Sequence, residues 1–279
     1  MSTTVAHPSE VAVPRSGPAR TGLWLPAFTL WQRELVRFYR QRSRVVGVIG
    51  SPIIFWLVIG SGFGRTFSAT GATGGQGFLE YFFPGTLVLI LLFTAIFTMM
   101  SVIEDRQEGF LLSVLAAPCP RVSIVLGKVF GGASLAAVQG MIFALLAPTI
   151  GIHLTVLRFF AIAGVVALIS FALTAVGFIV AWNLDSTHAF HAIVNLFLIP
   201  AWLLSGALFP VTEASRWIKW GMMANPLTYG TEALRAVLYP GSHGAFGLTT
   251  SLTTIVVFDL VMLALALWMV SREAGRKAA

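Results

Sequence analysis

Residues 104–128, EDRQEGFLLSVLAAPCPRVSIVLGK, separate two long apolar runs and begin with three acids in five positions. Asp105 is placed to cap a helix, and Glu108 follows three residues later in the pattern of a capping box. The prolines of the APCP segment would end that helix. The stretch therefore predicts a short helix over 105–117. An apolar stripe repeats along it at helical spacing, formed by Phe110, Leu111, Val114 and Leu115.

A capped helix with one apolar face is suited to docking in a groove of another protein. The alternative is a helix that rests on lipid head groups. Anionic head groups would repel Glu104, Asp105 and Glu108. We therefore favour docking on a partner protein.

The composition indicates a membrane protein. The chain has 279 residues, of which 57% are hydrophobic and 10% are charged, whereas soluble domains have about 25% charged residues. The net charge of +7 does not predict nucleic-acid binding, because the basic residues flank apolar runs and form no groove-reading motif. Membrane lipids with anionic head groups are the simpler partner. Residues 1–21 are rich in Pro, Ser and Ala and predict a disordered cytoplasmic tail.

A helix needs about 20 apolar residues to cross the hydrocarbon core of a bilayer. Six runs of the sequence meet this requirement, all within residues 45–271. The predicted fold class is therefore an all-α membrane protein with six transmembrane helices. The predicted spans are 45–63, 81–103, 129–152, 159–183, 192–209 and 248–270.

The distribution of Lys and Arg predicts the orientation of these spans. With the N-terminus inside, 13 of the 18 Lys and Arg residues fall on the inner side. Both termini, including a short tail at 272–279, are then cytoplasmic. Residues 104–128 form a cytoplasmic loop between the second and third spans.

Two further segments are too polar to cross the membrane. Residues 22–44 predict an amphipathic helix at the cytoplasmic interface. Residues 211–240 predict a re-entrant helical hairpin on the outer face, cut at Asn225–Pro226. In the first segment an apolar face lies opposite an arginine face; the two faces are Phe28, Trp31, Leu35, Phe38 and Tyr39, and Arg33, Arg37, Arg40 and Arg44.

Four features together resemble the integral-membrane permease subunit of type-2 ABC transporters. That family includes daunorubicin-resistance, lipo-oligosaccharide and polysaccharide exporters. The features are the arginine-rich helix before the first span, EDRQEGFLLSVLAAP, the six-span layout, and NPLTYGTEALRAVLYPG before the last span. The resemblance covers nearly the whole chain.

The resemblance implies ATP-driven export of a lipophilic drug, lipid or lipid-linked glycan across a bacterial inner (plasma) membrane. The helix at 104–117 would be a coupling helix seated in a cleft of a separate ATP-binding subunit. Two such subunits would work with a homodimer of permease chains. ATP and Mg²⁺ would bind to that partner, so this chain would not itself be an enzyme. The coupling residues would be Glu104, Asp105, Arg106, Glu108, Gly109, Phe110, Leu111 and Val114.

The resemblance also implies where a substrate would pass. A path between two permeases would be lined by the second and fifth spans, and the outer hairpin would form a gate. Packing or lipid contact is equally compatible with each residue of the path. The path residues are Phe93, Phe97, Met100, Asn195, Phe197 and Trp202, and the gate residues are Asn225, Pro226, Tyr229, Glu232 and Arg235.

The chain has no P-loop of its own. That motif requires G-x-x-x-x-G-K-[ST], whose backbone amides hold phosphate groups. The pair Gly127–Lys128 is followed by Val129, and Val122 stands where the first glycine should be. We therefore expect no cofactor on this chain.

Asp259 lies within the sixth predicted span, where an acid is by default a candidate proton relay or cation site. The alternative is a protonated or hydrogen-bonded acid that faces the bundle, and we favour it because a proton-driven pump would need more than one such carboxylate. As a functional acid, Asp259 would support the alternative of a secondary transporter or channel, although such proteins carry several buried ionisable groups and inverted repeats. An intramembrane enzyme is a third alternative. Asp185, His188 and His191 have a spacing that suits a metal, but no further ligands accompany them. We expect no metal and no catalytic residue.

Overall fold

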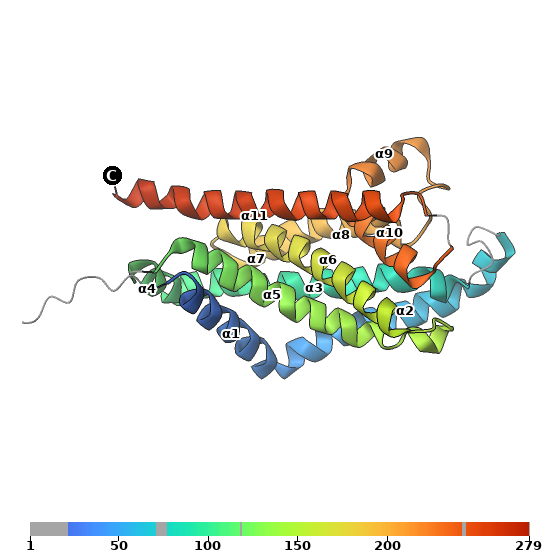
Figure 1. Cartoon of the computed structure of the whole chain (residues 1–279), viewed down its shortest axis with the longest axis horizontal. Helices are drawn as coiled ribbons and strands as arrows, with labels where there is room; N and C mark the ends of the chain where they lie inside the picture. The colour runs from blue at the N-terminus through green and yellow to red at the C-terminus, as the bar shows by residue number, and fades with distance from the viewer. Residues whose placement is uncertain (1–21, 71–76, 118, 242–243, 279) are drawn as a thin grey trace, which may run out of the picture.

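The computed structural model describes residues 22–70, 77–117, 119–241 and 244–278. Within these residues the chain is helical and contains no strand, and its long helices run side by side in an elongated bundle (Figure 1). The all-α class is confirmed, whereas the predicted tail at 1–21 lies outside the described residues. The α-helices are α1 (Trp24–Arg40), α2 (Arg42–Thr70), α3 (Phe78–Gln107), α4 (Phe110–Ala116), α5 (Arg121–Ala144), α6 (Val156–Trp182), α7 (Thr187–Ile193), α8 (Ile199–Trp202), α9 (Arg216–Ala224), α10 (Pro226–Leu238) and α11 (Leu248–Ala278).

Six helices in the described part of the chain are long and apolar enough to cross a membrane, which confirms the predicted number. Their limits are Val45–Phe63, Phe78–Gln107, Arg121–Ala144, Val156–Trp182, Thr187–Ala207 and Leu248–Arg272.

One predicted limit is wrong. The third span was expected at 129–152, whereas the candidate span lies at Arg121–Ala144, because Lys128 is paired inside the protein and does not have to stay in water. The sixth candidate span ends at Arg272, and α11 continues beyond it through the predicted tail to Ala278.

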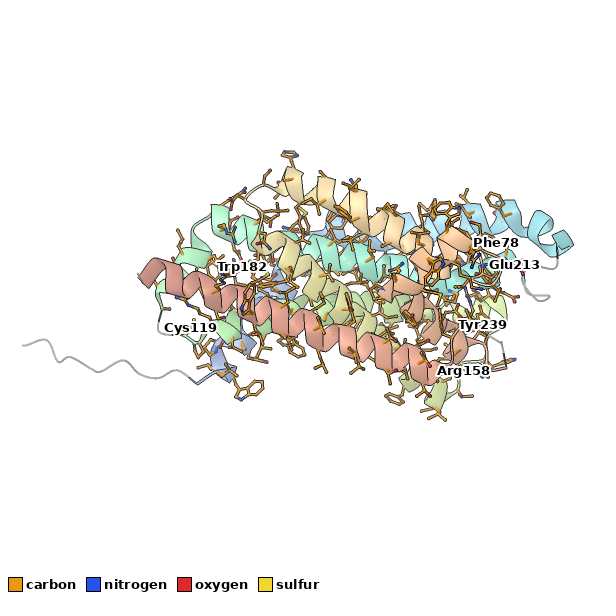
Figure 2. The ribbon with its side chains drawn as sticks, turned by 90° about the horizontal axis from the view of Figure 1, so that it is seen from above. Phe78, Cys119, Arg158, Trp182, Glu213 and Tyr239 are labelled. Atoms are coloured by element: carbon orange, nitrogen blue, oxygen red, sulfur yellow. The ribbon has the colours of Figure 1, made fainter. Side chains whose placement is uncertain are left out.

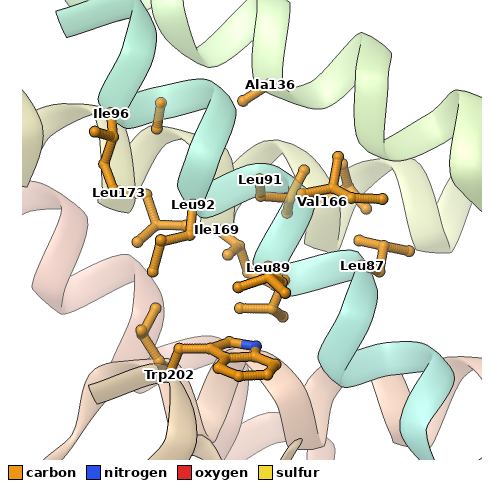
Figure 3. Packing of buried hydrophobic residues seen from close by; sticks show 14 of the residues in the cluster. Leu87, Leu89, Leu91, Leu92, Ile96, Ala136, Val166, Ile169, Leu173 and Trp202 are labelled. Carbon is orange, nitrogen blue, oxygen red and sulfur yellow. The ribbon is translucent and has the colours of Figure 1, made fainter. Parts of the chain in front are cut away.

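Helix α3 occupies the middle of the bundle. Of its most apolar stretch 83% is buried, against 22% for α2 and for α11, so the outer helices turn apolar faces away from the protein. Leucines of α3 pack against α5 and α6, as Figure 3 shows for Leu91, Ala136 and Val166. Such continuous apolar packing makes α3 the scaffold on which both ends of the bundle are built.

Helix α1 lies directly against α5. A Cβ on Gly127 would be 2.6 Å from the Cβ of Leu30, and one on Gly131 would be 2.9 Å from the Cβ of Glu34. The G-x-x-x-G pair therefore serves close helix packing, which brings the acid of α1 next to the lysine of α5.

The fifth span is not a regular α-helix. It consists of α7, a π-helical segment at Val194–Leu198, α8 and a second π-helical segment at Leu203–Ala207. Pro200 has no N–H to donate, and Gly206 has φ +79, so the helical hydrogen bonding is interrupted at both places. The backbone carbonyls of this span are consequently available to side chains of neighbouring helices.

The loop that links α6 to α7 and the loop that contains α4 lie at one end of the bundle, which we call the α4 end. The segment with α9 and α10 lies at the other, which we call the α9 end (Figure 1). In Figure 2 Trp182 and Cys119 mark the α4 end, and Glu213 and Tyr239 mark the α9 end.

Candidate functional site

Three charged side chains are buried where α1, α3 and α5 meet at the α4 end. Glu34, Asp105 and Lys128 are 2%, 0% and 1% exposed. Charges so deep in a protein persist only when they are paired and hydrogen-bonded. Together with the groups that bind them they form what we call the α1–α3–α5 cluster: Arg33, Glu34, Arg37, Ser101, Glu104, Asp105 and Lys128.

Asp105 is the centre of this cluster. Arg33 donates from Nη1 to Oδ2 at 2.9 Å and from Nη2 to Oδ1 at 2.7 Å, a two-pronged contact that fixes the guanidinium plane. Arg37 donates from Nη1 to Oδ1 at 2.6 Å, and Lys128 donates to Oδ2. The carboxylate thus joins α1, α3 and α5.

Lys128 is enclosed by acceptors. Its Nζ donates to Glu34 Oε1 at 2.6 Å and to Ser101 Oγ at 3.0 Å. The hydroxyl of Ser101 donates in turn to Glu34 Oε2 at 2.7 Å. The ammonium and both carboxylates are therefore satisfied without water.

The cluster is electrically balanced. Arg37 also contacts Glu104, from Nη2 to Oε2 at 2.5 Å. The hydrogen bond to Asp105 raises the pKa of Arg33 above its ordinary value, so this guanidinium stays charged. Three cations face three carboxylates, and these are Arg33, Arg37 and Lys128, and Glu34, Glu104 and Asp105.

The predicted capped helix at 105–117 is wrong in its start. Asp105 does not cap α4, because α3 continues to Gln107, and the new helix begins only after Gly109. Gly109 has φ +77, a conformation that glycine adopts without strain. The chain turns there, and α4 is a separate helix of seven residues that follows directly from the end of α3.

The apolar stripe of α4 faces its own chain. Leu111 is 4% exposed, and the ring of Phe110 lies under the guanidinium of Arg33 at 3.8 Å. The stripe was expected to face a partner, but the residues of α4 left at the surface are Leu112, Ser113 and Ala116, next to the exposed Glu108. The exposed face of α4 is thus a different face from the one that the sequence pattern indicated.

Arg106 connects the end of α3 to the turn between α6 and α7. It donates to Asp185 Oδ1 at 2.8 Å and to the carbonyl of Trp182 at 2.6 Å. Gln107 donates from Nε2 to the carbonyl of Asp185 at 2.8 Å. Asp185 therefore acts as an ion-pair partner. Within the described part of the chain no group of three His, Cys, Asp or Glu side chains is arranged to hold a metal.

Sequence reasoning missed five members of the α1–α3–α5 cluster. It assigned Arg33 and Arg37 to the face of residues 22–44 opposite the apolar face, and it gave no role in a site to Glu34, Ser101 or Lys128. A signal was present: Glu34 is the one acid of residues 22–44, and Lys128 stands alone among apolar neighbours. Isolated charges of this kind need partners inside the protein.

A second buried ion pair lies at the α9 end. Arg235 donates from Nη1 to Glu232 Oε1 at 2.6 Å and from Nη2 to the carbonyl of Gly206 at 3.1 Å. Tyr81 donates to the same carbonyl at 3.0 Å, and its ring lies 4.3 Å from the guanidinium. The other carboxylate oxygen of Glu232 accepts from the backbone N–H of Ala245 at 2.8 Å. We call these five residues the α10 cluster.

The remaining gate residues hold the break between α9 and α10. Asn225 accepts from the N–H of Leu227 at 3.1 Å and donates to the carbonyl of Ala201 at 2.5 Å. Pro226 begins α10, and Tyr229 donates to the carbonyl of Met223 at 2.9 Å. The gate residues are therefore brought together around the irregular fifth span.

The six predicted path residues are not brought together within one chain. Trp202 is 3% exposed and donates from Nε1 to the carbonyl of Gly85 at 2.8 Å, so it is part of the core. Phe93 and Phe97 are stacked at 6.3 Å and half-buried, whereas Phe197 is 64% exposed. Two others differ in the same way, since Met100 is buried and Asn195 is exposed.

The comparisons with known proteins identify the class of this membrane protein. Residues 27–239 match the family described as ABC-2 type transporter, and the chain belongs to that family. It is 25% identical over 252 residues to transport permease ycf38 of Cyanophora paradoxa, over 84% of this chain and 85% of that protein. It is 23% identical over 259 residues to Nodulation protein J of Sinorhizobium fredii, over 92% of this chain and 95% of that protein.

Family membership defines the general role of the molecule. The chain is a multi-pass membrane permease of an ABC transporter, and the family implies a separate ATP-binding subunit as its partner. The matched region contains α3, α4, the α1–α3–α5 cluster and all of α10.

Proposed function

We propose that this permease belongs to an ATP-driven exporter and that the segment from Glu104 to Ala116 docks on its ATP-binding subunit. The observation that carries the proposal is the rigid connection between α4 and the bundle. Asp105 in the last turn of α3 is bound by three cations, and Phe110 at the start of α4 is held under Arg33. A push on α4 would therefore reach α1, α3 and α5 together.

The same segment is connected to the fifth span. Arg106 and Gln107 hold Asp185, two residues before α7 begins. ATP binding by the partner would favour one arrangement of α4 over another, which is the differential interaction that any driven change requires. The change would then reach the irregular span through the turn between α6 and α7, and Glu232 and Arg235 would control its outer end.

The proposed assembly has two copies of this chain and two ATP-binding subunits, with ATP and Mg²⁺ on the latter. Exposed apolar faces on α2, the fifth span and α11 support contacts with lipid or a second permease. The α4 end would face the cytoplasm of a bacterial plasma membrane, as the bias of 13 of 18 basic residues indicates. The substrate would be a lipophilic drug, a lipid or a lipid-linked glycan.

The test is co-purification of the tagged chain with its ATP-binding subunit. Mass spectrometry identifies that subunit by the P-loop in the sequence of the co-purified protein. Leu112→Asp combined with Ser113→Lys changes the exposed face of α4 and alters no residue of the α1–α3–α5 cluster. We expect this variant to fold and to lose the ATP-binding subunit. Glu213→Lys, an exposed charge reversal at the α9 end, is the matched control and should retain it. Unchanged co-purification of the double variant would show that α4 is not the docking segment.

A further inference from the structure

A cavity of about 230 Å³ lies where α6, the irregular fifth span, α10 and α11 meet, and it is partly open to the outside. An apolar cavity of about 150 Å³ is enough to bind benzene, so this one has room for a short stretch of hydrocarbon chain. The lining includes Ile169 and Leu173 of α6, Ala201 of α8, Leu227 of α10, and Ile255 and Phe258 of α11.

The wall of the cavity is almost entirely apolar. Asn225 is the polar side chain among the described lining residues, and it is engaged: its Nδ2 donates to the carbonyl of Ala201, and its Oδ1 accepts from the N–H of Leu227. A buried water needs about two to four polar partners. The cavity therefore does not suit water, and a ligand that fills it needs no polar group.

The described lining residues include no charged side chain. Asp259 of α11 does not line the cavity; it is 6% exposed, and both of its carboxylate oxygens are inaccessible and without a hydrogen-bond partner among the described residues. Arg235 of α10 is engaged by Glu232 and by the carbonyl of Gly206. A charged group in the cavity would have no counter-ion, which is costly, so the part of a ligand that fills it is expected to be neutral hydrocarbon.

The surface around the cavity is apolar as well. Val261, one helical turn beyond Phe258 on α11, is 52% exposed, and Leu203, two residues after Ala201, is 38% exposed. Both belong to helices that are long and apolar enough to cross a membrane. Lipid chains are therefore the surroundings from which this cavity can be filled.

Packing supplies the reason for a chain to enter. Among lipid tails an apolar side chain gains nothing by leaving water, because no water is present. An empty cavity, however, deprives the atoms of its wall of van der Waals contacts, and a chain that enters restores them. The bilayer presents acyl chains at high concentration beside the cavity, so weak binding is sufficient to fill it.

We infer that this cavity is a binding site for an acyl chain of a membrane lipid. The chain lies between α6, α8, α10 and α11, next to the break at Asn225–Pro226. Because the wall includes residues on both sides of that break, a bound chain would hinder any movement of α10 toward α6. This consequence for the outer gate rests on the proposed function, whereas the binding of the chain does not.

The experiment is photolabelling of the purified full chain in nanodiscs that contain phosphatidylcholine with a diazirine at the end of one acyl chain. Labelled residues are located by proteolysis and mass spectrometry. Leu173 and Leu227 are 4% and 7% exposed, so a label on them reports a chain inside the cavity. Ala172→Phe fills the cavity and should remove the label from both residues but leave it on Val261. If this variant does not fold, Ala201→Leu serves the same purpose.

The matched control is Ala264→Phe, the same substitution at an exposed position of α11, which should leave the label on Leu173 and Leu227. A label confined to exposed residues of the wild-type chain would overturn the inference and show that the cavity is an unfilled packing gap. Equal labelling of Leu173 and Leu227 in the wild type and in Ala172→Phe would overturn it too. None of these results bears on docking at α4, which is measured by co-purification.

Discussion

The two ends of the bundle each bury an ion cluster, but the clusters connect different things. The α1–α3–α5 cluster joins three helices through side chains, and its Lys128–Glu34 contact spans 94 positions of sequence. The ion pair of the α10 cluster lies within one helix, three residues apart, and its other contacts are mainly with backbone groups of Gly206 and Ala245. The first cluster fixes helices to one another, whereas the second satisfies the backbone of an irregular span.

The largest effect is expected from Asp105→Ala. The change leaves three cations, of which Lys128 is fully buried, facing two carboxylates, and removal of one partner from a buried ion pair costs about 3–5 kcal/mol. The apparent Tm of the chain in detergent, followed by fluorescence-detected size exclusion, should fall steeply. Glu108→Ala is the control, because that side chain is 63% exposed and lies 3.9 Å from Arg37. Equal Tm values for the two variants would contradict the central role of Asp105.

Glu232→Ala should have an intermediate effect. Arg235 loses its carboxylate and the N–H of Ala245 loses its acceptor, but the guanidinium keeps the carbonyl of Gly206 and the ring of Tyr81. A cost of about 1–3 kcal/mol follows, measured by the same Tm assay. If Glu232→Ala lowered the Tm more than Asp105→Ala does, the α10 cluster would contribute more to stability than the α1–α3–α5 cluster, contrary to this comparison.

Arg33→Lys should cost about 1 kcal/mol, because lysine cannot make the two-pronged contact with Asp105 or lie flat on Phe110. The raised pKa of Arg33 means that its contribution is complete below the ordinary pKa of arginine and is lost only above it. The difference in Tm from the wild type should therefore be the same at about pH 6 and about pH 8. Arg40→Lys, at an exposed position of the same helix, is the control. A pH-dependent difference would show that Arg33 acts through another titrating group.

The smallest effect is expected from Glu34→Leu combined with Lys128→Met. The pair is removed as a unit, so Arg33, Arg37, Glu104 and Asp105 remain balanced. Replacement of a buried ion pair by apolar groups is often nearly neutral, whereas Lys128→Met alone leaves the buried Glu34 carboxylate with the hydroxyl of Ser101 and a long contact with Arg33. The double variant should melt close to the wild type and well above the single variant. A double variant less stable than the single one would mean that Glu34 has a partner more important than Lys128.

Sequence patterns predicted the fold class, the six spans and the break at Asn225–Pro226, because each depends on the composition of one continuous segment. They misplaced the start of the third span, since Lys128 resembles a membrane boundary unless its partners are known. They also predicted that the apolar stripe of α4 faces a partner protein, whereas it packs against its own chain. The position of Phe110 depends on Arg33 of α1, which is far away in the sequence.

What the sequence by itself determined is the number and length of the apolar helices, because a hydrocarbon core selects for local hydropathy. What only the tertiary structure decided is the pairing of charges. Glu34, Asp105 and Lys128 come from three separate helices, and their proximity depends on packing that no local pattern encodes. That Asp259 has no hydrogen-bond partner among the described residues is likewise a property of the assembled bundle. It can be established only when the positions of all the helices around Asp259 are known.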